Sequence, residues 1–254
     1  MRKIDRSKYR ECMDLAKKCA ADRVYPMSIA AGIQDGEIYT DDRGCFLFRH
    51  YCGFAYISGT LSPDVLEEIY QQFFVPETDR RFLLITDSDF VSGHYSDREL
   101  VRLDQRIEYI HSGMPEKAPV LSAVFDLERI TVGNYADIHG RIIPSFSWKS
   151  RDSFFENGFG FLARSREDGC FAAVAFSSGI SPEEVDIGVE TAEPYRHYGL
   201  ASFLAYKMCG EIIKQGKKPV WAHAKNNIGS GRTAVSAGFS PFRVNTVIRK
   251  NNYE

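Results

Sequence analysis

Arg196, Gly199 and Ala201 form an RxxGxA pattern that directly follows an apolar run and directly precedes an amphipathic one. This order predicts a strand, a tight basic turn and the start of a helix. The first N–H groups of a helix have no intrahelical acceptor and lie at the positive end of the dipole, so they bind anions. Small residues at 199 and 201 let a phosphate approach the backbone. The pattern predicts a phosphate cradle, and an ordinary strand-to-helix turn is the alternative.

A second group of residues follows the first along the chain. Asn227 and Ser230 are placed to open a helix, Ala234 lies inside it, and Gly238 and Phe239 end it. The preceding residues 219–224 are mainly apolar and predict a strand. The two groups together therefore predict strand, turn and helix, then strand and helix again.

This succession of motifs resembles the GNAT superfamily of acetyl-CoA-dependent N-acetyltransferases, over about residues 119–254. Two motifs in the expected order are more specific than either motif alone. The resemblance implies an α/β (α+β) fold, with a mixed and mostly antiparallel sheet flanked by helices. It also implies acetyl-CoA as cofactor and an amine, from a small molecule or a protein, as acceptor.

The resemblance assigns residues to the cofactor. Backbone N–H groups from His197 to Ala201, with the Arg196 side chain, would hold the pyrophosphate. The strand that ends at Thr191 would splay from the strand of Trp221 and admit the pantetheine arm. The residues implied for the cofactor are Val189, Thr191, Arg196, His197, Tyr198, Gly199, Leu200, Ala201, Asn227 and Ser230. Asparagine also caps helices well, so Asn227 has a structural alternative.

Direct acyl transfer needs a base, because an ammonium cannot attack a thioester. Glu190 and Asp186 are the candidates: both point to the same side of one strand, and Gly188 leaves space between them. The structural alternative for each carboxylate is a solvated charge on the surface or the ion-pair partner of a nearby arginine. His223 is either a proton relay or a structural histidine.

One position departs from the family pattern. Many members carry a tyrosine where this chain has Ala234, and its hydroxyl can protonate the leaving thiolate. Water, Ser230 or Tyr198 could replace it. The second hypothesis is therefore a non-catalytic sensor of acyl-CoA with the same fold.

Composition and charge limit the classes of partner that we expect for this protein. The chain has 254 residues, of which 44% are hydrophobic and 26% charged, as in ordinary globular proteins. The formal net charge of -2 gives no general attraction to nucleic acid. No apolar run approaches a membrane span and no signal-peptide pattern is present, so we expect a cytoplasmic protein without membrane contact. The six cysteines form no CxxC pair, so no metal site is expected.

The chain is expected to have two parts, because Gly113–Pro119 combines a glycine, two prolines and charges. We place the acetyltransferase domain at 119–254 and an N-terminal α/β region at 1–118. That region contains a predicted helix over 6–21, a helix from Ser62 to about Phe74 and a strand over 82–86. It is either a degenerate acetyltransferase-like half or a packing module, in which case a homodimer is an option.

Overall fold

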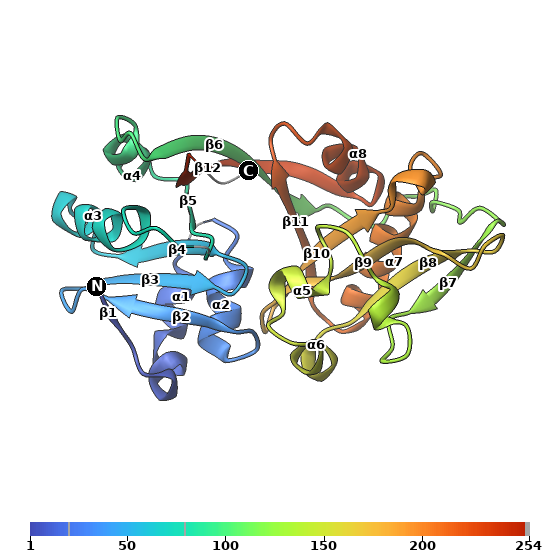
Figure 1. Cartoon of the computed structure of the whole chain (residues 1–254), viewed down its shortest axis with the longest axis horizontal. Coiled ribbons are helices and arrows are strands. Elements are labelled where there is room, and N and C mark those ends of the chain that lie inside the picture. Colours follow the sequence, from blue (N-terminus) through green and yellow to red (C-terminus); the bar gives the residue numbers. More distant parts are fainter. Residues whose placement is uncertain (20, 79, 252–254) are drawn as a thin grey trace. The chain divides into compact units, whose positions relative to one another are not determined.

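The computed structural model describes residues 1–251 apart from 20 and 79, and these divide into two compact units (Figure 1). The first unit contains residues 1–108 together with the chain from Arg243 onward, and the second contains Tyr109–Phe242. Two strands supply residues to both units: β6 (Val101–His111) and β12 (Phe239–Lys250).

The first unit contains a mostly antiparallel sheet in the strand order β1-β2-β3-β4-β5-β12-β6. β5 pairs in parallel with β4 and antiparallel with β12. The remaining strands of this unit are β1 (Arg2–Lys3), β2 (Gly36–Thr40), β3 (Cys45–His50), β4 (Phe54–Gly59) and β5 (Leu83–Thr86).

The helices of the first unit follow local sequence signals in part. Ser62 caps α3 by accepting a hydrogen bond from the Val65 N–H, and Pro63 occupies the first turn, as predicted. The predicted helix over 6–21 is instead a 3-10 segment followed by a short α-helix that ends at Lys17. The N–H groups of residues 18 and 19 bond three residues back, which tightens its end. The helical segments are η1 (Arg6–Cys12), α1 (Met13–Lys17), α2 (Val24–Ala31), α3 (Pro63–Ile69), η2 (Tyr70–Phe74) and α4 (Asp89–Tyr95).

The core of the first unit is rich in aromatic side chains. Phe73 stacks on Phe82 with ring centroids 4.7 Å apart, and Phe74 meets the same ring edge-on at 5.0 Å. Ile248 of β12 is fully buried in this cluster. The C-terminal strand therefore completes the core that the N-terminal helices begin.

The second unit has strands in the order β11-β10-β9-β8-β7. Neighbours from β7 to β10 pair antiparallel, whereas β10 and β11 pair in parallel. The strands are β7 (Phe125–Arg129), β8 (Gly160–Ser165), β9 (Phe171–Ile180), β10 (Glu184–Thr191) and β11 (Lys218–Ala224). Both units thus confirm the predicted mixed fold.

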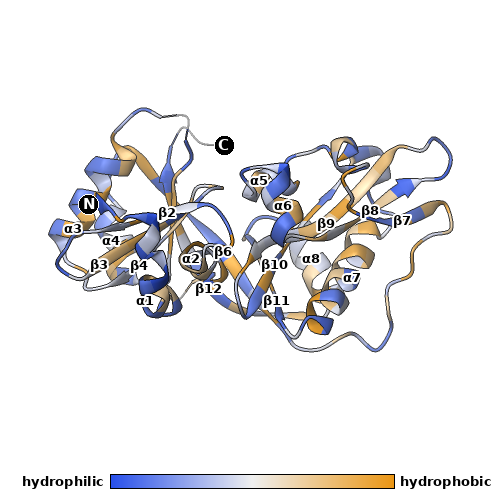
Figure 2. Cartoon of the chain, turned by 90° about the horizontal axis from the view of Figure 1, so that it is seen from below, coloured by the Kyte–Doolittle hydropathy of each residue, from blue (hydrophilic) through white to orange (hydrophobic). Residues whose placement is uncertain are grey.

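Helices in the second unit cover a strongly apolar sheet. All residues of β9 are buried, and α7 packs against β8, β9 and β10, where Figure 2 shows hydrophobic residues concentrated. The helical segments are η3 (Tyr135–Asp137), α5 (Pro144–Ser147), α6 (Arg151–Asn157), η4 (Glu193–Tyr195), α7 (Leu200–Lys214) and α8 (Ile228–Ser236). Within the described part of the chain, no helix has both the length and the apolar character needed to cross a membrane.

Candidate active site

The turn between β10 and α7 has an uncommon backbone. His197 has φ 71° and Gly199, the N-cap of α7, has φ 76°. A positive φ favours glycine, and a histidine there is sparsely populated. A Cβ built on Gly199 would meet no atom within 4 Å, so the space in front of this backbone is open. The turn therefore has the shape that the phosphate-cradle prediction requires.

The first backbone N–H groups of α7 are donors without an intrahelical acceptor. The first intrahelical hydrogen bond runs from the Phe203 N–H to the Gly199 carbonyl, at 3.0 Å. The N–H groups of Leu200, Ala201 and Ser202 precede it and have no intrahelical acceptor. An anion in the open space would satisfy them and meet the positive end of the helix dipole.

Aromatic contacts fix the turn on both sides. Phe125 of β7 lies edge-on to Tyr195 and to Tyr198, with centroids 5.8 and 5.3 Å apart. The Tyr195 hydroxyl donates to Asp168 Oδ2 at 2.7 Å. Hydrogen bonds from the Cys170 N–H and from Tyr195 lower the pKa of Asp168 to about 2. Asp168 is thus a permanently ionised anchor for the turn.

β10 and β11 diverge after a short parallel contact. Their pairing joins Glu184–Asp186 to Lys218–Val220, although the strands continue to Thr191 and Ala224. β10 meanwhile remains paired with β9 as far as Thr191. Among the described residues, the main-chain groups of Val189–Thr191 that face β11 therefore have no pairing partner on that strand, as a splayed pair of strands requires.

Glu190 is fixed by a loop that follows β7. Its Oε2 accepts a hydrogen bond from the Ile142 N–H at 2.9 Å. A Cβ on Gly140 would lie 2.6 Å from Glu190 Cγ, so glycine is needed for this approach. The carboxylate is half-buried, with one oxygen occupied by a backbone donor.

Asp186 lies four residues before Glu190 on β10 and is 6% exposed. The idea that Gly188 leaves free space between the two carboxylates is wrong. A Cβ there would lie 2.6 Å from two carbons of the Phe176 ring, so this ring fills the space. The glycine accommodates core packing.

Asn227 and Ser230 both have structural partners. Asn227 caps α8, with its Oδ1 accepting from the Ser230 N–H at 3.1 Å. The Trp221 Nε1–H donates to Ser230 Oγ at 3.2 Å. The capping alternative for Asn227 is confirmed, and the Ser230 hydroxyl retains its own proton to donate.

Tyr109, the partner of His223, was not among the predicted site residues. The Tyr109 hydroxyl lies 3.0 Å from His223 Nε2, and His223 Nδ1 lies 2.8 Å from the Ala224 carbonyl. The carbonyl only accepts, so Nδ1 carries a proton and, in a neutral ring, Nε2 accepts from Tyr109. A Cβ on Gly231 would lie 3.2 Å from the Tyr109 oxygen, so the hydroxyl faces α8 one turn before buried Ala234. The partial alternation of apolar and polar residues in β6 was the sequence signal that could have predicted this strand.

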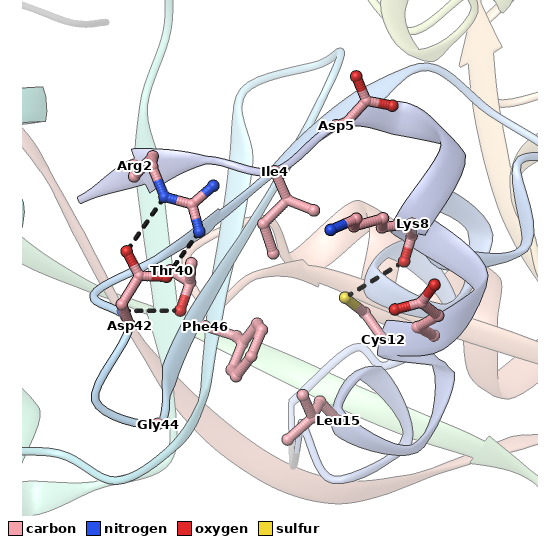
Figure 3. A pocket seen from close by; sticks show the side chains of 11 residues that line it. Arg2, Ile4, Asp5, Lys8, Cys12, Leu15, Thr40, Asp42, Gly44 and Phe46 are labelled. Atoms are coloured by element: carbon pink, nitrogen blue, oxygen red, sulfur yellow. Dashed lines mark hydrogen bonds and ion pairs between the residues drawn. The ribbon is translucent and has the colours of Figure 1, made fainter.

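A separate cavity of about 440 Å³ lies in the first unit beside η1 (Figure 3). Ile4, Leu15 and Phe46 form apolar walls, and Arg2 pairs with Asp42 at 2.6 Å on its border. None of the predicted site residues lines this cavity.

The second unit thus combines a mixed sheet whose parallel strands diverge, a glycine turn and a helix whose first N–H groups have no intrahelical acceptor, which is the arrangement expected from the resemblance. The chain belongs to the GNAT acetyltransferase family, whose model matches residues 13–243. This confirms the resemblance found in residues 119–254 and extends it into the first unit.

Solved structures support the same fold. A GCN5-related N-acetyltransferase-like protein from Streptococcus suis superposes with a TM-score of 0.71 at 16% identity, covering 97% of this chain and 100% of that one. A Drosophila protein gives 0.63 at 16% identity, covering 98% and 97%. A tandem GNAT protein from the clavulanic acid biosynthesis pathway gives 0.59 at 11% identity, covering 96% and 93%. No curated protein matches the chain.

Proposed function

We propose that this protein transfers the acetyl group of acetyl-CoA to a primary amine. The observation that carries the proposal is the open turn at His197 and Gly199, which leads into the first N–H groups of α7, and these have no intrahelical acceptor. A diphosphate fits such a turn because several N–H donors and a helix dipole converge on it. Family membership supports an acetyltransferase.

The residues proposed for the cofactor fall into three groups. Arg196 and the N–H groups of 197–201 would hold the pyrophosphate. The main-chain groups of Val189 and Thr191 on the side of β10 away from β9 would hydrogen-bond the pantetheine arm in the splayed region. Asn227 and Ser230, at the start of α8, would border the same arm.

The base in this proposal is Glu190, with Asp186 as the alternative. Acetyl-CoA supplies an activated acyl group, and the protein must remove a proton from the attacking ammonium. Glu190 is half-buried and has an oxygen beyond the one that accepts from Ile142, so it can take a proton directly or through water. Asp186 is more deeply buried. The nitrogen loses two protons on its way from ammonium to amide: the departing thiolate gains one, and the base passes the other to solvent.

Tyr109 is proposed as a donor for that thiolate, beside Ser230, Tyr198 and water. Its hydroxyl reaches the face of α8 that carries Ala234, where the chain has no tyrosine of its own. Burial raises the pKa of Tyr109, so the phenol keeps its proton near neutral pH. In the structure the single proton of this hydroxyl is donated to His223 Nε2, so the hydroxyl would have to turn from Nε2 to the thiolate to protonate it.

We further propose that the N-terminal region is a degenerate GNAT-like half. In each unit, a run of antiparallel strands ends in a parallel pair joined through a helix: β4, α3 and β5 repeat the order of β10, α7 and β11. The cradle is not repeated, because Pro63 has no N–H and Ser62 caps Val65. Calorimetry should therefore give one coenzyme A per chain, and two would contradict the assignment.

The transferase proposal is tested by following thiol release from acetyl-CoA with a panel of primary amines. Calorimetric binding of acetyl-CoA together with amine-dependent thiol release is the expected result. Binding without release across the panel would identify a sensor. If coenzyme A does not bind at millimolar concentration, the cradle assignment is wrong.

A further inference from the structure

The first unit contains a polar cluster around Glu108 that the proposed reaction does not use. The Glu108 cluster comprises Asp22, Arg106, Glu108, Arg243 and Asn245. Arg106 Nε donates to Asp22 Oδ2 at 2.9 Å, and Asn245 Nδ2 donates to Glu108 Oε2 at 3.2 Å. Arg243 Nε lies 3.4 Å from the same Glu108 oxygen. Residues distant in sequence thus share one small polar region.

The Glu108 cluster carries more negative than positive charge. Three carboxylates pair here with two guanidinium groups. Arg106 pairs with Asp22, and Arg243 pairs with the neighbouring Asp87 at 2.9 Å and with Glu108 at 3.4 Å. The side chains of Asp22 and Glu108 are 5% and 16% exposed. Burial and the charge of Asp22 raise the pKa of Glu108 to about 7, against the hydrogen bond from Asn245 and the charge of Arg243. One more positive charge would therefore stabilise the cluster.

An unsatisfied acceptor lies beside this excess charge. The Asn245 side chain is fully buried, and its Oδ1 accepts no hydrogen bond from any described residue. The Tyr56 hydroxyl, on a residue 1% exposed, likewise has no partner among them, and the charges of Asp22 and Arg106 both act on it. A buried polar atom without a partner is destabilising, because no hydrogen bond replaces the one that it made to water in the unfolded chain. A ligand that donates N–H bonds would remove this cost.

We propose that the Glu108 cluster binds a protonated primary amine, which donates hydrogen bonds to the Glu108 carboxylate and to Asn245 Oδ1. Such a cation balances the excess negative charge and donates a hydrogen bond to Asn245 Oδ1. An anion or an apolar molecule does neither. The exposed part of Glu108 gives the ammonium access from solvent. The site lies within the first unit and requires no acetyl transfer, although an amine is also the acceptor class proposed above.

The first test follows the side-chain amide signal of Asn245 in the 15N-labelled full chain at pH 8, where Glu108 is ionised. Addition of n-butylammonium should shift this signal in a saturating manner at millimolar concentration. Tetramethylammonium has the charge without N–H donors and n-butanol lacks the charge, so both should shift it far less. No saturating shift with n-butylammonium, an equal shift with tetramethylammonium, or a shift with Mg²⁺ alone would overturn the proposal.

The second test uses Glu108→Gln, which keeps the shape and removes the charge. Its affinity for n-butylammonium should fall about tenfold or more, the loss expected for a hydrogen bond to a charged group. Glu99→Gln, an exposed site in the same unit, is the matched control and should bind as the wild type does. Equal affinity of Glu108→Gln and wild type would contradict the proposal.

Proton release gives a check on the unmodified protein. Binding of a cation stabilises ionised Glu108, so calorimetry of the wild type near pH 7, in two buffers of different ionisation enthalpy, should show that a proton leaves. Binding without any proton exchange would exclude Glu108 as the ligand. This measurement decides the question even if Glu108→Gln does not fold.

Discussion

The Tyr109 hydroxyl lies 3.0 Å from His223 Nε2, although 114 positions separate the two residues in sequence. Both side chains are almost completely buried, and the oxygen faces α8 at Gly231. β6 thus brings a phenol to the helix that carries Ala234.

Removal of this phenol tests its role as a proton donor. Tyr109→Phe should lower kcat by about tenfold to a hundredfold and leave KM for acetyl-CoA nearly unchanged, since general acids contribute to chemistry rather than to cofactor binding. An acetyl thioester of an acidic aryl thiol needs no protonation, so with this donor the variant should match the wild type. Tyr206→Phe controls for the loss of a hydroxyl elsewhere. If Tyr109→Phe lowers kcat equally with acetyl-CoA and with the aryl thioester, Tyr109 only supports the structure.

Gly199→Glu should weaken coenzyme A binding at least about tenfold, because it places bulk and negative charge where the pyrophosphate would lie. Gly216→Glu is a matched control: its glycine also has positive φ, 73° against 76°, and an added Cβ would likewise meet no atom within 4 Å, but it follows the C-terminal end of α7. Calorimetry should show near-normal affinity in the control. Equal affinities in the two variants would refute the placement of the cradle.

Glu190→Gln should reduce transfer far more than acetyl-CoA affinity, because the amide cannot take a proton yet can still accept from Ile142. The expected loss in kcat is about a hundredfold. Asp186→Asn is compared in parallel and decides between the two carboxylates. Wild-type rates in both variants would remove these residues from the mechanism.

Stability should fall as the pH rises through the range in which Glu108 ionises. The pKa of Glu108 is raised from its ordinary 4.5 to about 7 in the folded protein. Between these values the folded state binds more protons than the unfolded state, so its stability is lost as pH increases. The loss should be about 1–3 kcal/mol between pH 4.5 and 7. Denaturant titrations should show this slope in the wild type and a weaker one in Glu108→Gln; identical slopes would contradict it.

Local chemistry made the turn before α7 and the start of α3 predictable. At Gly199 the conformation depends on the residue itself, and at Ser62 the cap bonds a donor three residues away. The helix expected over 6–21 shows the limit of periodicity, since an apolar stripe does not determine whether N–H groups bond three or four residues back.

Contacts between distant segments were not predictable from the sequence alone. The bond from Ile142 to Glu190 spans 48 positions and depends on Gly140, whose role only the folded loop reveals. Glu108 and Asn245 are 137 positions apart. No local pattern encodes these pairs, because their proximity results from the order of the strands.

β12 pairs with β5, and the first unit includes the chain from Arg243 onward. During synthesis, the edge of β5 and the aromatic cluster that includes Ile248 therefore remain incomplete until the residues of β12 have left the ribosome. The second unit, which lies wholly within Tyr109–Phe242, is free to fold earlier. Translation thus completes the two units in the reverse of the order in which it begins them, and the first unit has an unpaired strand edge in the interval.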